Sequence, residues 1–222
     1  MKVTLVSSSQ PSKELAEQGI INVQELVAYC ARVSNPANQN NTDTSEKLIR
    51  YLIKHKHWSP LEMVSACLEI ETTRDIARQI LRHRSFSFQE FSQRYADPTK
   101  DLAFVTREAR LQDTKNRQNS ITTDDQQLQA EWSDVQGRII EANQFAYEWA
   151  ITKGIAKEQA RAVLSEGLTV SRLYMQGSLR SWLHYIELRS GPETQKEHRE
   201  IAEACAKSLE SIFPMVTEFL VK

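Results

Sequence analysis

The chain has 222 residues, a formal net charge of −1 and a hydrophobic content of 40%. This length fits one domain with a sizeable core, and the near-neutral charge gives no reason to expect a membrane surface or a polyanion as partner. No apolar run approaches the roughly 20 residues that a bilayer span requires. Cys30, Cys67 and Cys205 lie far apart, which is typical of thiols in a reducing compartment, so we expect a cytoplasmic protein.

The spacing of apolar residues predicts few strands among many helices. In chain order we expect a strand over residues 1–6, helices over 23–33 and 45–54, a strand over 64–72, a helix over 73–82, a short strand over 102–105, a polar surface loop over 113–127, helices over 128–152 and 156–164, a strand over 167–174, and helices over 178–188 and 193–212. The predicted fold class is therefore α+β, a single domain over residues 1–222 with a small, mostly antiparallel sheet packed with several helices.

The most varied segment is residues 82–95, where three arginines, a histidine, a glutamate and hydroxyls are interleaved with aromatic side chains. A core would not tolerate these groups unpaired, and arginine suits phosphate, so the segment indicates a site for an anionic, planar ligand. Upstream, Arg74, Arg78 and Arg82 recur at every fourth residue on one face of the predicted helix. For the first two, a solvated helix face is an equally ordinary explanation.

An extended backbone over residues 89–95 would place Glu90, Ser92 and Arg94 on one side of a strand. Such a face offers a carboxylate acceptor, a hydroxyl and a bidentate donor together. Uracil, ribose and phosphate can use all three kinds of group. We therefore expect these side chains to act together on a nucleotide.

Two common kinds of site are excluded by the sequence. The six glycines are dispersed, so there is neither a Rossmann fingerprint nor a P-loop, and a bound nucleotide must be held by side chains, chiefly arginine. The pair His55 and His57 has no companion cysteine or histidine at ligand spacing, so we expect no metal site.

Four segments resemble one known family in order and spacing. The run Arg82-His83-Arg84, followed by seven residues and Ser92, resembles the signature of flavin-dependent thymidylate synthases. Residues 57–62 resemble the family's His-x-(Ser/Thr)-Pro-x-Glu segment, and residues 158–164 and 179–189 resemble its two C-terminal motifs. The resemblance covers about residues 1–215 and implies methylation of dUMP to dTMP, with 5,10-methylenetetrahydrofolate as carbon donor and NADPH reducing bound FAD. It also implies a homotetramer with active sites shared between subunits.

The resemblance also implies residue roles. The positions that match dUMP-binding residues are Gln79, Arg82, Glu90, Ser92, Arg94, Arg161 and Arg189. The positions that match FAD-contacting residues are Ser59, Arg82, His83, Arg84, Glu90, Ser178, Arg180 and His184. Arg161 would reach the phosphate from another subunit. Arg189 is the expected catalytic residue, because a guanidinium at the uracil would stabilise the ring as an N3 anion; without the resemblance it would pass for a cation at a helix C-terminus.

Two other classes of function remain open from the residues themselves. A single-stranded nucleic-acid binder could use the same arginines, with Phe86, Phe88 and Phe91 as stacking platforms, although the net charge of −1 opposes it. A nucleotide- or flavin-binding regulator would keep the arginine cluster without needing Arg189. The cysteines lie in no nucleophile motif, which argues against the cysteine-dependent class of thymidylate synthase.

Overall fold

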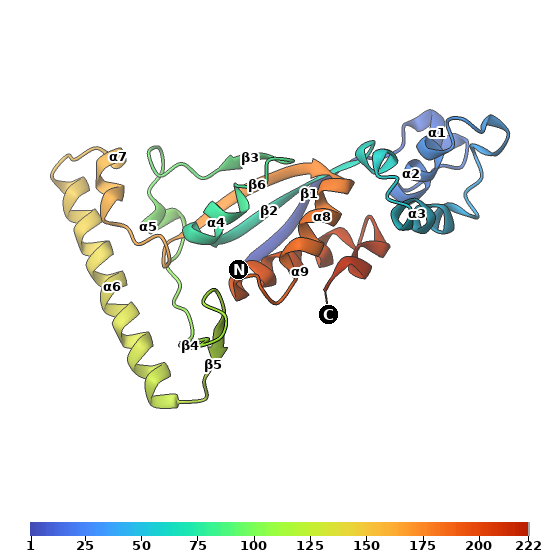
Figure 1. The fold of residues 1–222 in the computed structure, drawn as a ribbon. Coiled ribbons are helices and arrows are strands. Elements are labelled where there is room, and N and C mark those ends of the chain that lie inside the picture. Colours follow the sequence, from blue (N-terminus) through green and yellow to red (C-terminus); the bar gives the residue numbers. More distant parts are fainter. Residues whose placement is uncertain (222) are drawn as a thin grey trace.

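The computed structural model describes residues 1–221 and is built around one antiparallel sheet (Figure 1). The strand order is β1 (Lys2–Ser8), β2 (Ser65–Thr73), β6 (Val170–Ser178) and β3 (Ser87–Glu90). The two central strands pair along their whole length, from Ser65 opposite Ser178 to Thr73 opposite Val170. The predicted α+β class with a small antiparallel sheet is confirmed.

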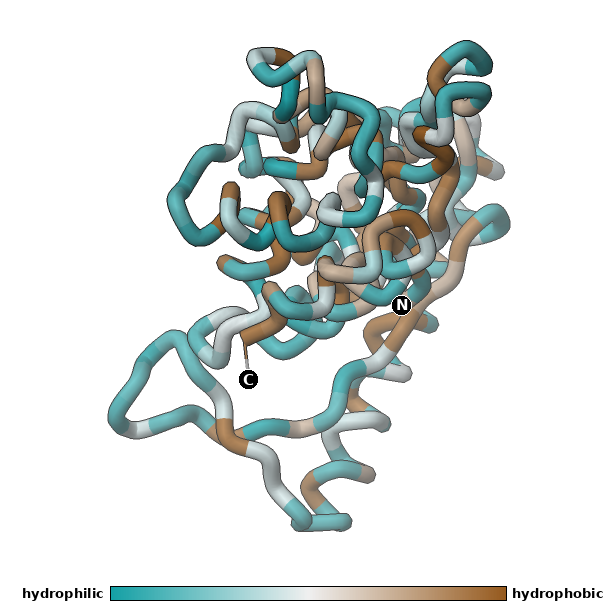
Figure 2. Tube along the Cα trace, turned by 90° about the vertical axis from the view of Figure 1, so that its right-hand side faces the viewer, coloured by the Kyte–Doolittle hydropathy of each residue, from teal (hydrophilic) through white to brown (hydrophobic). Residues whose placement is uncertain are grey.

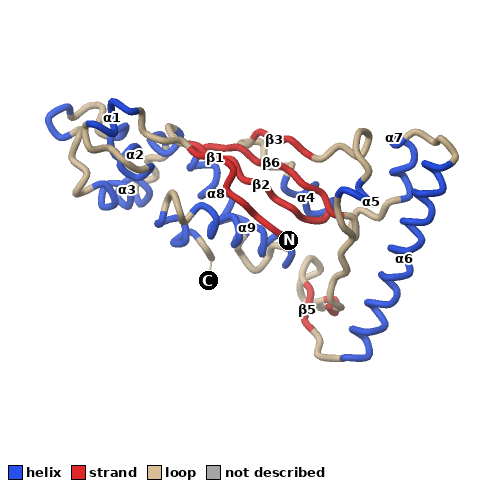
Figure 3. The backbone as a smooth tube through the Cα atoms, turned by 180° about the vertical axis from the view of Figure 1, so that it is seen from behind, coloured by secondary structure: helices blue, strands red, loops and turns tan. Residues whose placement is uncertain are grey.

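One face of the sheet is apolar and carries the core. Leu68 and Ile70 of β2 and Leu173 and Met175 of β6 have no exposed surface, as the two-residue alternation of strands requires. Helices α8 (Leu179–Arg189) and α9 (Lys196–Leu209) pack on this face and are seen beneath the sheet in Figures 1 and 3. The indole N–H of Trp182 donates to the Ala66 carbonyl at 3.0 Å, so the largest core side chain is also satisfied as a donor.

Helical segments lie at both ends of the sheet (Figure 1). Between β1 and β2 come α1 (Lys13–Glu17), α2 (Val23–Ala31), η1 (Pro36–Asn38), α3 (Ser45–Lys54) and η2 (Ser59–Glu62). After β2 come α4 (Arg74–Ile80), α5 (Pro98–Asp101), the hairpin of β4 (Arg110–Gln112) and β5 (Ser120–Thr122), α6 (Gln126–Thr152), α7 (Lys157–Ala160) and η3 (Arg161–Val163). Element η4 (Pro214–Phe219) follows α9. Figure 2 shows the extension that carries the hairpin as mostly hydrophilic.

Several predicted boundaries are wrong. The strand expected over 102–105 is reduced to one bridge between Phe104 and Thr169, and the expected loop over 113–127 contains β5. The last strand begins at Val170 and runs to Ser178, and the expected helix over 156–164 divides into α7 and η3. Among residues 1–221, no helix combines the length and apolarity that crossing a membrane would need.

Candidate active site

The residues singled out from the sequence fall into three groups. The helix-end group, at the ends of α4 and α8, comprises Gln79, Arg82, His83, Arg84 and Arg189. The β3-turn group comprises Glu90, Ser92, Arg94 and Arg161. The η2 group, where η2 meets the start of α8, comprises Ser59, Ser178, Arg180 and His184.

Arg189 and His83 are in direct contact in the helix-end group. Arg189 is the last residue of α8, and its Nε donates to Nε2 of His83 at 2.9 Å. Burial and the positive charges of Arg189 and Arg82 lower the pKa of His83 to about 4, so the imidazole is neutral at pH 7 and can accept. Neither Arg82 nor Arg84 forms a side-chain hydrogen bond or ion pair within residues 1–221, and both are exposed. Their charges are free for an anionic ligand.

The β3-turn group is not the single strand face that the sequence predicts. Strand β3 ends at Glu90, and the backbone N–H of Tyr95 donates to the Ser92 carbonyl, which closes a turn. Pairing with β6 ends at Phe91, whose N–H donates to the Arg172 carbonyl at 2.8 Å, so the extended backbone considered over 89–95 is not formed beyond this residue. The turn carries Arg94 towards α7, where its Nε lies 3.6 Å from Oε2 of Glu158.

Glu90 nevertheless faces a polar environment beside the turn. Its Oε1 accepts from the Ser171 hydroxyl at 2.8 Å and lies 3.6 Å from Nη1 of the buried Arg74. A surface cavity of about 540 Å³ opens here, lined by Gln89, Glu90, Phe91, Ser92, Tyr95, Ala96, Arg172 and Tyr174. Arg161 lies in η3, and its Nε donates to the Glu158 carbonyl at 3.3 Å.

The η2 group is organised by the start of α8. The Ser178 hydroxyl accepts from the Ser181 backbone N–H at 3.2 Å, so it serves as the N-cap. Arg180 pairs with Glu62 of η2 at 2.9 Å, and the ring of His184 contacts that of Trp58 edge-on at 4.5 Å between centroids. A single helix thus carries residues of this group in its first two turns and Arg189 at its end.

Sequence reasoning missed polar residues that lie behind the helix-end group. His198 has no exposed surface, and it contacts both Gln79 and Tyr185. A signal for its burial was present, because His198 precedes Ile201, Ala202 and Cys205 on the apolar stripe of α9 at helical spacing. Its contact with Gln79, 119 residues away, could not be read from that stripe. Among the described residues, no group of three potential ligands could hold a metal ion.

An antiparallel sheet flanked by arginine-rich helix ends defines an α+β protein with a site suited to anionic ligands. Residues 19–215 match the family model described as thymidylate synthase complementing protein. The chain is similar to the flavin-dependent thymidylate synthase of Synechocystis sp. (48% identical, 99% of each chain) and to the probable flavin-dependent thymidylate synthase of Paramecium bursaria Chlorella virus 1 (44% identical, 99% of each chain). A solved structure of the UMP/dUMP methylase PolB from Streptomyces cacaoi, bound with 5-Br UMP, superposes with a TM-score of 0.79 at 25% identity, covering 98% of this chain and 92% of the other.

The chain therefore belongs to the flavin-dependent thymidylate synthase family. This membership confirms the resemblance inferred from the arginine signature, makes the protein an enzyme and identifies FAD as its cofactor. It gives no support to the nucleic-acid interpretation.

Proposed function

We propose that the enzyme methylates dUMP to dTMP in de novo thymidylate synthesis, with 5,10-methylenetetrahydrofolate as carbon donor and NADPH as reductant through bound FAD. The observation that carries this proposal is the Arg189–His83 pair beside the unpaired charges of Arg82 and Arg84. A neutral imidazole and three guanidiniums at one rim suit a ligand that is both planar and anionic.

The pyrimidine ring would lie against Arg189. A guanidinium there stabilises negative charge as it develops on the uracil, and it acts without reorganisation if its position is already fixed. The hydrogen bond from Nε of Arg189 to His83 holds the guanidinium in place and leaves both of its terminal nitrogens free to bind the ligand. A protonated His83 could not accept this bond, so the low pKa of His83 is part of the arrangement.

The remaining dUMP-binding positions support a site shared between subunits. Within residues 1–221, no hydrogen bond or ion pair links the β3-turn group to the helix-end group. In a homotetramer, Arg161 of one subunit would reach the phosphate of the dUMP that is bound by Gln79 and Arg82 of another. Glu90, Ser92 and Arg94 would complete the set from the turn.

The residues present fit FAD. Its pyrophosphate is anionic, and without a glycine-rich loop it needs basic side chains such as the exposed Arg82 and Arg84. When bound, FAD supplies the redox chemistry that connects NADPH to the transferred carbon. The η2 group would hold the rest of the cofactor, with Ser59 and Arg180 at the solvent side and His184 packed on Trp58.

The test is spectroscopic and kinetic. The purified protein should show flavin absorption bands that dUMP perturbs on titration, and it should form dTMP when the folate and NADPH are added. Arg189→Lys should keep the flavin spectrum but lose turnover by about 10²–10³-fold, the usual effect of removing a donor to developing negative charge. The matched control is Arg117→Lys, in the exposed hairpin loop, which should turn over like wild type. A colourless protein that takes up no FAD, or an Arg189→Lys variant with normal turnover, would refute the proposal.

A further inference from the structure

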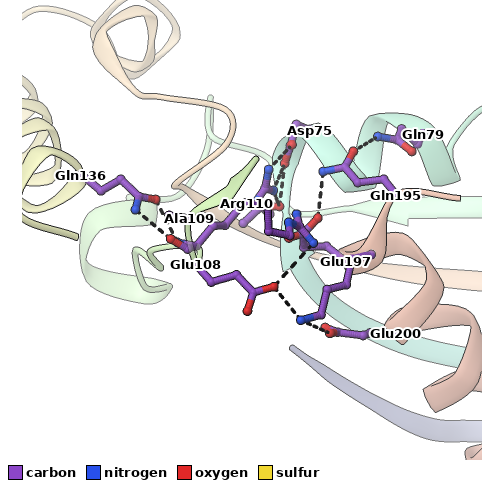
Figure 4. Close-up of polar contacts among 12 residues, drawn as sticks. Asp75, Gln79, Glu108, Ala109, Arg110, Gln136, Gln195, Glu197 and Glu200 are labelled. Atoms are coloured by element: carbon purple, nitrogen blue, oxygen red, sulfur yellow. Dashed lines mark hydrogen bonds and ion pairs between the residues drawn. The ribbon is translucent and has the colours of Figure 1, made fainter. Parts of the chain in front are cut away.

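The side-chain amide of Gln79 is held from two sides by buried or half-buried partners. Its Nε2 donates to Oε1 of Gln195 at 2.9 Å, and its Oε1 lies 3.1 Å from Nδ1 of His198. On the far side of the imidazole, Nε2 of His198 lies 3.1 Å from the hydroxyl of Tyr185, which is also buried. The interaction of Gln79 with Gln195 is drawn in Figure 4.

Glu197 sets the direction of these hydrogen bonds. An ionised carboxylate can only accept, so Gln195 must turn its Nε2 towards Oε2 of Glu197, at 2.9 Å. The other carboxylate oxygen accepts from Nη2 of Arg110 (Figure 4). The side chain of Arg110 is also largely buried. Burial alone would raise the pKa of Glu197, but its own backbone N–H, Gln195 and the Arg110 charge outweigh that effect and hold the pKa below its ordinary value.

The orientation of the Gln195 amide, which Glu197 determines, in turn determines the orientation of the Gln79 amide and the tautomer of His198. With Nε2 of Gln195 committed, its Oε1 faces Gln79, and Oε1 of Gln79 then needs a donor. Nδ1 of His198 must therefore carry the proton, and its Nε2 must accept from Tyr185. We call this series the amide chain; in order from the charged end it runs Arg110, Glu197, Gln195, Gln79, His198, Tyr185.

We propose that the amide chain fixes which end of the Gln79 amide faces the pyrimidine, so that Glu197 and His198 are positioning residues for substrate recognition. This inference rests on the proposed function, in which Gln79 binds dUMP. One N–H and one lone pair of Gln79 remain outside the amide chain, and a flipped amide would exchange their places. Uracil presents an acceptor at position 4 where cytosine presents a donor, so a fixed amide gives the site a means to distinguish them.

The variant Glu197→Gln tests the direction of the chain without changing its shape. The new amide has one oxygen, and we expect it to accept from the charged Arg110. Its NH2 group would then face Gln195. Gln195 and Gln79 would then both flip, and His198 would move its proton from Nδ1 to Nε2. Nitrogen-15 NMR of the imidazole should therefore show the Nδ1–H tautomer in wild type and the Nε2–H tautomer in the variant.

The kinetic consequence should appear in substrate recognition. KM for dUMP should rise on the order of tenfold in Glu197→Gln, because the reversed Gln79 amide would place a donor against a donor, or an acceptor against an acceptor, on the pyrimidine. The preference for binding dUMP over dCMP should also fall. A smaller change is expected in kcat. Gln195→Met, which removes the link without adding a new polar group, should raise KM similarly and provides a second variant should Glu197→Gln fold poorly. Thermal unfolding of each variant reports its folded state.

The matched control is Glu200→Gln on the same helix. Glu200 lies 4.0 Å from Lys196 and outside the amide chain, so this variant should keep the wild-type tautomer and KM. Wild-type tautomer and KM in both Glu197→Gln and Gln195→Met, in an enzyme that methylates dUMP, would overturn this inference and leave the proposed function standing. A wild-type protein that does not bind dUMP would overturn the proposed function, and this inference with it.

Discussion

A close contact between Gly177 and Phe86 makes the core beneath the arginine signature sensitive to a single methyl group. Gly177 lies in β6, and a Cβ built there would meet Cδ1 and Cε1 of Phe86 at 2.4 and 2.6 Å. The ring cannot swing aside freely, because its centroid lies 4.8 Å from that of Trp182 and 6.0 Å from that of Tyr185. Gly177→Ala must therefore displace a packed aromatic ring by about 1 Å to reach ordinary contact distance.

Overpacking of this kind costs about 1–3 kcal/mol. For a chain of this size, that free energy corresponds to a fall in Tm of about 2–12 °C. Phe86 follows Arg84 by two residues, so the displaced ring should also disturb Arg84, one of the proposed FAD contacts, and weaken FAD retention. Far-ultraviolet circular dichroism on heating measures the first effect, and flavin released per protomer measures the second.

The control is a second glycine-to-alanine change. Gly137 lies within α6, and a Cβ there would meet nothing within 4 Å. Gly137→Ala should therefore stabilise by about 0.5–1 kcal/mol, through the lower backbone entropy of the unfolded chain, and leave FAD binding unchanged. Equal Tm values for wild type and Gly177→Ala would show that the ring has room to move and that the reasoning is wrong.

The remaining predictions concern protonation and the thiols. His83 has a pKa of about 4 in the folded protein against an ordinary 6.5, so the unfolded chain binds more protons between these values and the free energy of unfolding should fall as pH drops from 6.5 towards 4. Urea titrations at pH 7 and 5 measure this fall in the free energy of unfolding, and His83→Gln should lessen it. The same pH dependence in wild type and His83→Gln would contradict the lowered pKa of His83. Cys30→Ala and Cys67→Ala should keep full turnover. Cys205→Ala should lower stability by about 1–2 kcal/mol through a core cavity without changing turnover per folded molecule, and loss of turnover in any folded variant would indicate a thiol nucleophile.

Periodicity predicted the elements that have one buried face. The alternation over 64–72 became β2, and the helical spacings over 45–54 and 178–188 became α3 and α8, each shifted by one residue at most. Segments that depend on local hydrogen bonds were not predicted. The turn after Glu90 and the β4–β5 hairpin arise from backbone pairing between mostly polar residues, which leaves no apolar pattern to detect.

The candidate site divides in the same way. Arg82, His83 and Arg84 are consecutive, so their clustering was visible in the sequence, whereas the contact of His83 with Arg189, 106 residues away, was not. The amide chain joins α4, α8, α9 and the hairpin, and it rests on contacts between residues up to 119 apart. Burial of His198 could be inferred from its place in α9, but its partner could not, because no local rule relates α9 to α4.

The hydrogen bond from Arg189 to His83 also has an entropic consequence. A free arginine side chain samples many rotamers, and a ligand that immobilises it loses part of its affinity in doing so. With Nε already held at 2.9 Å from His83, much of that freedom is lost when the chain folds. In the proposed role, dUMP would meet a guanidinium whose orientation is settled in advance, so that less of the energy of contact is spent on ordering the enzyme.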